Sequence, residues 1–213
     1  MDNRIHQWNL KRRAVCLCFL FLFYLNSSSA FAQRVTIPVQ TAGNSLVLQT
    51  DEFKNLSIIY YGEKLSDANE YSMIPQVYNQ TSDYSGMLNS AYTSSGSRNL
   101  VEPAITVTHA DGNNSLDLQY VSHDVKKIDD NVSQYAITLK DSVYDFSVIL
   151  YYKAYYQQDL IEQWSVIKHK EKGNVILHKY ASANLYLKAG SFWLNQYHGD
   201  WAREMQPQEA EQV

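Results

Sequence analysis

The stretch DFSVILYY, Asp145–Tyr152, sets the pattern for the whole chain. Phe146, Val148, Leu150 and Tyr152 occupy every second position. Successive side chains of a β-strand point to opposite faces of a sheet, so these four residues would line one face. The stretch therefore predicts a strand with one buried face.

The chain after this stretch repeats the two-residue period. Two opposite faces are expected for residues 160–168, one with Ile161, Ser165 and Ile167, the other with Leu160, Trp164 and Val166. The polar run Glu171–Asn174 predicts a turn. Residues 175–187 would then form one long strand, with a bulge near Ala181–Ala183.

Shorter strands are predicted before the stretch, at residues 35–37, 46–48, 56–61, 104–109, 116–120 and 134–139. Gly62–Glu63 would end one of them, and Asp111–Asn114 would close a hairpin between residues 104–109 and 116–120. No long apolar stripe with helical spacing is present. Ten or more strands with short polar turns predict an all-β fold, an antiparallel β-sandwich.

One segment interrupts this rhythm. Ser66–Glu102 is about 37 residues long and rich in Ser, Asn, Tyr and Gly. A loop of that length in a compact domain usually has a function or covers another surface. An insertion without a role is the alternative.

The first 32 residues predict a cleaved secretory signal peptide. Four basic residues precede the apolar run Ala14–Leu25, and Ala30–Ala32 is a small-residue cleavage site. The apolar run is shorter than the roughly 20 residues that span a bilayer, although an N-terminal membrane anchor is the alternative. We therefore expect a leader at residues 1–32, one β-sandwich domain at residues 33–213, and a secreted or periplasmic protein.

Composition excludes several kinds of site. Both cysteines, Cys16 and Cys18, lie in the leader, so disulfides and thiolate metal sites are not expected in the mature chain. The mature net charge is −7, because the leader carries four basic residues and one acid, and nucleic acid is a poor partner. We expect no cofactor.

Catalytic and metal-binding motifs are likewise not expected. The five histidines of the mature chain have no ligand-like spacing and suggest sheet-surface or loop positions: His109, His123, His169, His178 and His198. The acids near predicted turns form no marked pair of the kind a glycosidase requires: Asp111, Asp117, Asp124, Asp129 and Asp130. We assign no catalytic residue.

The closing stretch FWLNQYHGDWAREMQPQEAEQV, Phe192–Val213, combines aromatic and charged residues. Trp201 lies between Asp200 and the pair Arg203–Glu204, with no hydrophobic element after it. Exposed aromatic residues in such a setting usually indicate an interface. Trp201, Arg203 and Glu204 are therefore our candidates for a surface that another domain covers.

Several short motifs resemble the N-terminal β-domain of glycoside hydrolase family 36 α-galactosidases. GDWAREM, Gly199–Met205, resembles the segment that ends this domain. LSIIYYGEK, Leu56–Lys64, resembles an early strand and turn. Glu102–Ile105 with Asp111–Gly112, and then Leu116–Tyr120, resemble two later strands and the turn between them. The resemblance extends over residues 46–205.

The resemblance implies a many-stranded supersandwich that is followed by a (β/α)₈ barrel. In the family, two Asp residues of the barrel perform a retaining hydrolysis of galactosides. The chain would then be a non-catalytic fragment, with the barrel as its missing partner and homo-oligomer contacts as a further role. The family also implies a loop at the pocket rim, here Ile74–Tyr78, with Tyr78 where other members have an acid.

Two other interpretations remain open from the sequence. A free-standing carbohydrate-binding or adhesion sandwich would use exposed tyrosines of the long segment as stacking platforms, namely Tyr71, Tyr78, Tyr84 and Tyr92. The N-terminal sandwich of another glycoside hydrolase, such as an α-glucosidase, is the second.

Overall fold

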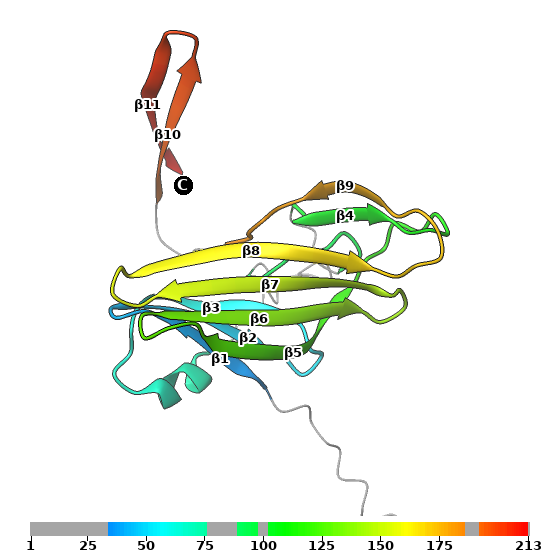
Figure 1. Ribbon diagram of the computed structural model, residues 1–213, viewed down its shortest axis with the longest axis horizontal. Coiled ribbons are helices and arrows are strands. Elements are labelled where there is room, and N and C mark those ends of the chain that lie inside the picture. Colours follow the sequence, from blue (N-terminus) through cyan, green and yellow to red (C-terminus); the bar gives the residue numbers. More distant parts are fainter. Residues whose placement is uncertain (1–33, 76–88, 98–101, 186–191, 213) are drawn as a thin grey trace, which may run out of the picture. The chain divides into compact units, whose positions relative to one another are not determined.

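The computed structural model describes residues 34–75, 89–97, 102–185 and 192–212. This part of the chain contains eleven strands and one short 3₁₀ helix (Figure 1). The elements are β1 (Thr36–Gln40), β2 (Asn44–Thr50), β3 (Leu56–Glu63), η1 (Ala68–Met73), β4 (Ile105–Thr108), β5 (Leu118–Lys127), β6 (Val132–Asp141), β7 (Phe146–Tyr155), β8 (Leu160–His169), β9 (Ile176–Tyr180), β10 (Phe192–Asp200) and β11 (Arg203–Gln212). The prediction of an all-β fold is confirmed.

The largest sheet is a four-stranded antiparallel meander in the order β5-β6-β7-β8 (Figure 1). In β7, buried residues alternate with half-buried ones from Phe146 to Tyr155, as the two-residue period predicts. Ile161 and Ile167 of β8 pack against the core from the same face. The faces predicted for both strands are therefore correct.

A second sheet contains β1, β2 and β3, with β2 in the centre. Every residue of β2 from Ser45 to Thr50 is buried, so both faces of this strand are covered. Tyr71 of η1 reaches the polar face, where its hydroxyl lies 2.7 Å from Ser45 Oγ and accepts the Leu65 N–H at 2.9 Å. The beginning of the long segment therefore covers this sheet.

Residues 89–95 connect the second sheet to the strand pair β4–β9. Ala91 donates to the Leu56 carbonyl on β3, and Ala104, directly before β4, donates to the Thr93 carbonyl. Tyr92 is buried, and its hydroxyl donates to the Ala181 carbonyl after β9. This second part of the long segment is thus built into the fold.

One hydrophobic core joins the two sheets, β4 and the long segment. It joins side chains from both sheets and from the long segment: Ile37, Val39, Leu46, Leu48, Leu56, Ile58, Ala91, Tyr92, Ala104, Ile105, Val107, Leu116, Leu118, Ile137, Leu139, Phe146, Val148, Leu150, Tyr152 and Ala154. A core of this size, without any disulfide, can stabilise a domain of this length. The sandwich prediction is confirmed in this respect too.

The predicted hairpin between residues 104–109 and 116–120 is wrong. β4 pairs with β9, whereas β5 pairs with β6. Asp111–Asn114 does form a turn, in which His109 N–H donates to the Asn113 carbonyl at 2.8 Å. However, the chain then crosses from the β4–β9 pair to the four-stranded sheet that begins with β5. Leu116 and Leu118 are buried in the core along this crossing.

Two predicted strand ends also differ from the structure. β9 ends at Tyr180, because Ala181 leaves the ladder and binds Ala104, Tyr92 and Ser165 through its backbone. The prediction of one strand over residues 175–187 is therefore wrong, because residues 181–185 are not part of a strand. Residues 186 and 187 lie outside the described residues. β3 continues through Gly62–Glu63, which was predicted as a turn, because β2 pairs with both residues.

Turns at one end of the sandwich are fastened to each other by Asp159. This residue lies between β7 and β8 with a φ of 51°, and its carboxylate accepts the Gly43 N–H at 2.7 Å. Hydrogen bonds from Gly43 and from the Thr41 hydroxyl hold the pKa of Asp159 below its usual value.

No helix among the described residues is long and apolar enough to cross a membrane.

Candidate interaction surface

The candidate residues Trp201, Arg203 and Glu204 lie at the tip of the hairpin β10–β11. The two strands pair antiparallel, and Asp200 lies opposite Arg203 across a two-residue turn. Ala202 adopts a φ of 62° in this turn, and the Asp200 carboxylate accepts the Trp201 N–H at 2.7 Å. The local backbone thus places Trp201 at the apex.

The side chains of this tip are exposed. Trp201 is 93% exposed, and both Arg203 and Glu204 are exposed as well. Among the described residues, neither Arg203 nor Glu204 has an ion-pair partner. The structure therefore places the three predicted residues together on one exposed tip.

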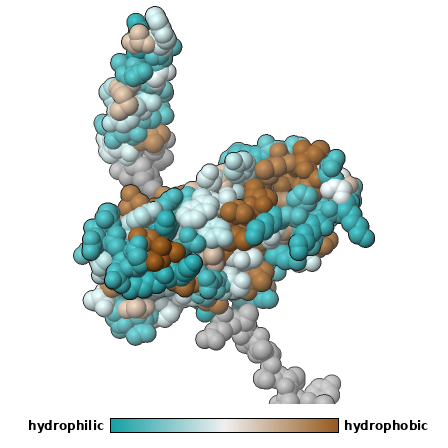
Figure 2. All heavy atoms as spheres, viewed as in Figure 1, coloured by the Kyte–Doolittle hydropathy of each residue, from teal (hydrophilic) through white to brown (hydrophobic). Residues whose placement is uncertain are grey.

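A second exposed apolar surface is formed by the residues of β9 itself. All five residues of this strand are exposed, including the apolar Ile176, Leu177 and Tyr180. Figure 2 shows hydrophobic residues gathered over the region of β9 and the neighbouring part of β8. An apolar surface on an edge strand usually indicates a contact with another protein surface.

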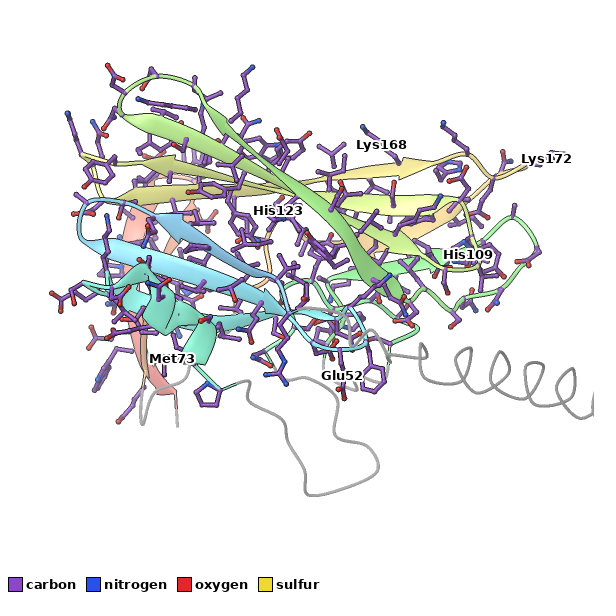
Figure 3. The ribbon with its side chains drawn as sticks, turned by 90° about the horizontal axis from the view of Figure 1, so that it is seen from below. Glu52, Met73, His109, His123, Lys168 and Lys172 are labelled. Atoms are coloured by element: carbon purple, nitrogen blue, oxygen red, sulfur yellow. The ribbon has the colours of Figure 1, made fainter. Side chains whose placement is uncertain are left out.

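The described part of the chain also contains a buried pair of hydrogen-bonded side chains, His109 and Glu171, at the end of the sandwich where Lys172 lies (Figure 3). His109 Nδ1 lies 2.8 Å from Glu171 Oε1, with exposed side-chain fractions of 0% and 7%. His109 Nε2 lies 3.1 Å from the Ser115 carbonyl oxygen, which can only accept, so Nε2 carries a proton. The Ala110 N–H donates to the second carboxylate oxygen.

His109 lies in the loop directly after β4, one of the two positions predicted for it, but its side chain is buried. Its carboxylate partner, Glu171, is 62 residues away in sequence, on the turn between β8 and β9, so sequence spacing could not reveal the pair. Every polar atom of the pair has a partner, which suits a structural role better than proton transfer.

Tyr144 covers this pair. Its ring stacks on the His109 ring at 3.6 Å between centroids, and its hydroxyl donates to Asp111 Oδ2 at 2.9 Å. Hydrogen bonds from the Asn113 N–H and from Tyr144 hold the pKa of Asp111 below its usual value. Partial burial, together with the Asp111 carboxylate, raises the pKa of Tyr144. These contacts fasten the turn Asp111–Asn114.

Several of the acids near turns are held by hydrogen bonds or an ion pair. Burial, and then the neighbouring Asp141, raise the pKa of Asp117. Yet Asp141 itself accepts three backbone N–H groups, from Asp117, Val143 and Tyr144, which makes it a turn residue. Asp129 likewise caps the turn before β6, and Asp130 pairs with Lys127.

The remaining histidines have separate neighbours. His123 bonds to the Tyr120 hydroxyl, His178 to Thr108 and His198 to Gln208, whereas His169 stacks on Phe146. Throughout the ranges that the structure describes, no three His, Cys, Asp or Glu residues are grouped so that they could hold a metal ion.

The sugar-stacking interpretation of the long segment is wrong for two of its four tyrosines. Tyr71 and Tyr92 are buried, and their hydroxyls bind the protein itself. Tyr78 and Tyr84 lie outside the described residues, as does most of the predicted rim segment, Gln76–Tyr78. Ile74 and Pro75, which begin that segment, directly follow η1.

Comparison with known protein families gives one clear match. The family described as the glycosyl hydrolase family 36 N-terminal domain matches residues 54–212, which is most of the chain. A comparison with curated protein sequences finds no match.

Several solved structures share the fold. The α-galactosidase AgaA A355E from Geobacillus stearothermophilus, in complex with 1-deoxygalactonojirimycin, is 19% identical with a TM-score of 0.71. The match covers 84% of this chain and 28% of that one. The α-galactosidase from Lactobacillus brevis is 19% identical with a TM-score of 0.69, over 86% of this chain and 28% of that one.

The galactosidase domain of the α-galactosidase-sucrose kinase AgaSK gives a similar result. It is 21% identical with a TM-score of 0.71, over 83% of this chain and 29% of that one. At this identity, the structural likeness establishes the fold alone. The chain spans less than a third of the length of these enzymes, and by its match over residues 54–212 it belongs to the glycoside hydrolase family 36 N-terminal domain family.

Proposed function

We propose that the chain is the non-catalytic N-terminal domain of a secreted or periplasmic α-galactosidase, which hydrolyses terminal α-galactosides in its full length. The family match carries this proposal. The solved relatives are described as α-galactosidases, and this chain spans 28% of their length.

In this proposal, the exposed surfaces of the domain contact the catalytic domain. Trp201 and Arg203 are exposed residues of the types that are enriched at interface centres, and Glu204 suits the polar rim of such a contact. The apolar side chains of β9 are a second contact surface. The catalytic domain, expected to be a barrel, would then bind the galactoside and supply both catalytic carboxylates.

The proposal predicts that the purified protein does not hydrolyse nitrophenyl α-galactoside. A retaining glycosidase requires two carboxylates about 5 Å apart on either side of the scissile bond, and this proposal places both on the catalytic domain. The measurement is release of nitrophenol, with a complete α-galactosidase as the positive control. Turnover that co-purifies with the chain and survives repeated chromatography would contradict a non-catalytic role.

The localisation proposal predicts cleavage after Ala32. Expression in a bacterium with a general secretion system should give a protein that begins at Gln33, as measured by intact mass and N-terminal sequencing. An Ala32→Trp variant should retain its leader, because the cleavage site requires small residues. An uncleaved parent protein in the membrane fraction would instead favour an N-terminal anchor.

A further inference from the structure

The four-stranded sheet ends at β8, and the outer edge of this strand is open. Among the described residues, β8 pairs with β7 alone, and it is the outermost strand of the meander (Figure 1). The Lys170 N–H donates to the Asp145 carbonyl, next to the paired residues of β7 and β8. Antiparallel ladders alternate between bonded and non-bonded pairs, so every second N–H of β8 points away from β7. These outward donors belong to Ile161, Gln163, Ser165, Ile167 and His169.

The opposite layer of the sandwich extends further than β8. Residues 89–95 join β3 to β4 through an isolated bridge to each strand, and β9 pairs with β4 on its other side. β9 is therefore the last described strand of this layer, and it follows β8 in the chain. The Ser165 hydroxyl of β8 donates to the Ala181 carbonyl, directly after β9, at 3.2 Å. The ends of the two layers thus lie next to each other.

The inward face of β9 is only partly covered by the described residues. Leu177 lies opposite Val107 of β4. Tyr180 lies opposite Ile105, and directly opposed residues share one face of a sheet. Both partners on β4 are completely buried in the core, whereas Leu177 is 42% and Tyr180 is 58% exposed. The inner side of β9 therefore extends beyond the sheet that covers β4.

The edge of β8 lacks the features that usually protect an open edge, which are charged residues, proline and bulges. At the other end of the same sheet, β5 carries Asp124, Lys126 and Lys127, and it pairs with β6 through a bulge. In contrast, β8 has no Asp, Glu, Lys or Arg between Glu162 and Lys168. It also contains no proline and pairs with β7 without a bulge. Another strand can therefore extend the sheet at β8.

We propose that a β-strand from the part of the full-length enzyme outside this chain pairs with the outer edge of β8 and covers Leu177 and Tyr180. Such a strand would lie about 5 Å beyond β8 and would face β9 across the sandwich. Its carbonyl groups accept the outward N–H groups of β8. Its inward side chains are apolar, because they pack on the exposed apolar residues of β9.

The rest of the enzyme suits this position better than a second copy of the chain does. The match covers 28% of the α-galactosidase AgaA and 29% of the galactosidase domain of AgaSK, so most of their length lies outside it. A second copy that paired its own β8 antiparallel with this edge would bring its β9 to the same side of the sheet. The two β9 strands would then compete for one space. The inference rests on the proposed function, because it requires a longer enzyme.

Amide hydrogen exchange tests the proposal within a single strand. In this chain, the outward N–H groups of Gln163 and Ser165 should exchange at least about tenfold faster than those of Trp164 and Val166, which bond to β7. In the full-length enzyme, all four should exchange slowly. Slow exchange of Gln163 and Ser165 in this chain would overturn the proposal, because the chain itself would then occupy the edge. Protection that grows with the concentration of this chain would overturn it in favour of a second copy.

The same experiment separates this inference from the proposed function. A full-length enzyme that hydrolyses nitrophenyl α-galactoside but exchanges the Gln163 and Ser165 amides rapidly would overturn the added strand alone. A full-length protein that protects both amides but lacks this activity would contradict the α-galactosidase proposal alone. A reading frame that stops directly after Val213 would overturn both.

Two proline variants provide a second test. Gln163→Pro removes an outward donor of β8, and Val125→Pro removes one of β5, because Val125 forms a non-bonded pair with Tyr135. In the full-length enzyme, Gln163→Pro should lower the melting temperature by at least about 5 °C more than it does in this chain, because it blocks the added strand. The shift caused by Val125→Pro should differ by less than about 2 °C between the two proteins.

The comparison of each variant in both proteins cancels local effects of the proline. Gln163→Pro also removes the side-chain hydrogen bond from Gln163 to the Tyr152 hydroxyl, but this loss is the same in either protein. Equal shifts of Gln163→Pro in this chain and in the full-length enzyme would contradict the added strand.

Discussion

Leu150→Ala should lower the free energy of unfolding by about 3 kcal/mol. Leu150 is completely buried in the centre of β7 and belongs to the core that joins both sheets. Removal of its side-chain atoms loses the transfer free energy of the buried groups and leaves a cavity that the surrounding strands can fill only in part. Urea unfolding followed by circular dichroism measures the change.

The adjacent residue provides the matched control. Ile149 lies next to Leu150 in the same strand, but its side chain points to the outer face of the sheet and is half-buried. Ile149→Ala should lower stability by only about 1 kcal/mol, since it removes less buried apolar surface. If both substitutions had the same effect, the assignment of the two faces of β7 would be wrong.

The same two-residue period explains which parts of the fold could be predicted from the sequence. β7 is long and alternates strictly between buried and half-buried residues, so both its existence and its faces followed from the sequence. β8 is equally long and was also predicted, although its burial alternates less regularly. The turn Asp111–Asn114 was also recognisable. The hairpin predicted around this turn was wrong, because turn residues indicate that the chain reverses but not which strands pair afterwards. β4 instead pairs with β9, about 70 residues later.

The long segment shows a second limit of sequence patterns. Tyr71 and Tyr92 stand among Ser, Asn and Gly, so no apolar periodicity indicates that they are buried. Their burial depends on hydroxyl partners at Ser45 and at the Ala181 carbonyl, which are distant in sequence. A tyrosine in a polar segment can therefore be part of the core when the fold supplies a partner for its hydroxyl.

The candidate surface was predicted from composition, and its geometry was not. The aromatic and charged residues of Gly199–Met205 suggested an interface. The sequence did not show that Trp201 lies at the apex of a turn, because Ala202 adopts a left-handed conformation that alanine rarely takes. It also did not show the register of the hairpin, which places Pro207 opposite Tyr197.

Gly96→Ala should be at least as destabilising as the core substitution, by about 3 kcal/mol or more. A Cβ atom at this position would lie 2.2 Å from the backbone nitrogen of Leu116 and 2.8 Å from its carbonyl carbon. The Gly96 N–H donates to the Leu116 carbonyl at 2.9 Å, which holds the two backbones together. Relief of the clash must move Leu116, which is completely buried in the core.

Gly112 is the control position, because a substitution there tests backbone conformation without any steric clash. Nothing lies within 4 Å of a Cβ at Gly112, but its φ is +89°. Gly112→Ala should therefore cost about 1 kcal/mol, from backbone strain alone, and Gly112→Asn should cost less, because asparagine tolerates this conformation. Asparagine should give no such relief at Gly96, where its Cβ meets the same backbone atoms. If urea unfolding showed Gly96→Ala to be as mild as Gly112→Ala, the close approach of residues 95–97 to Leu116 would be contradicted.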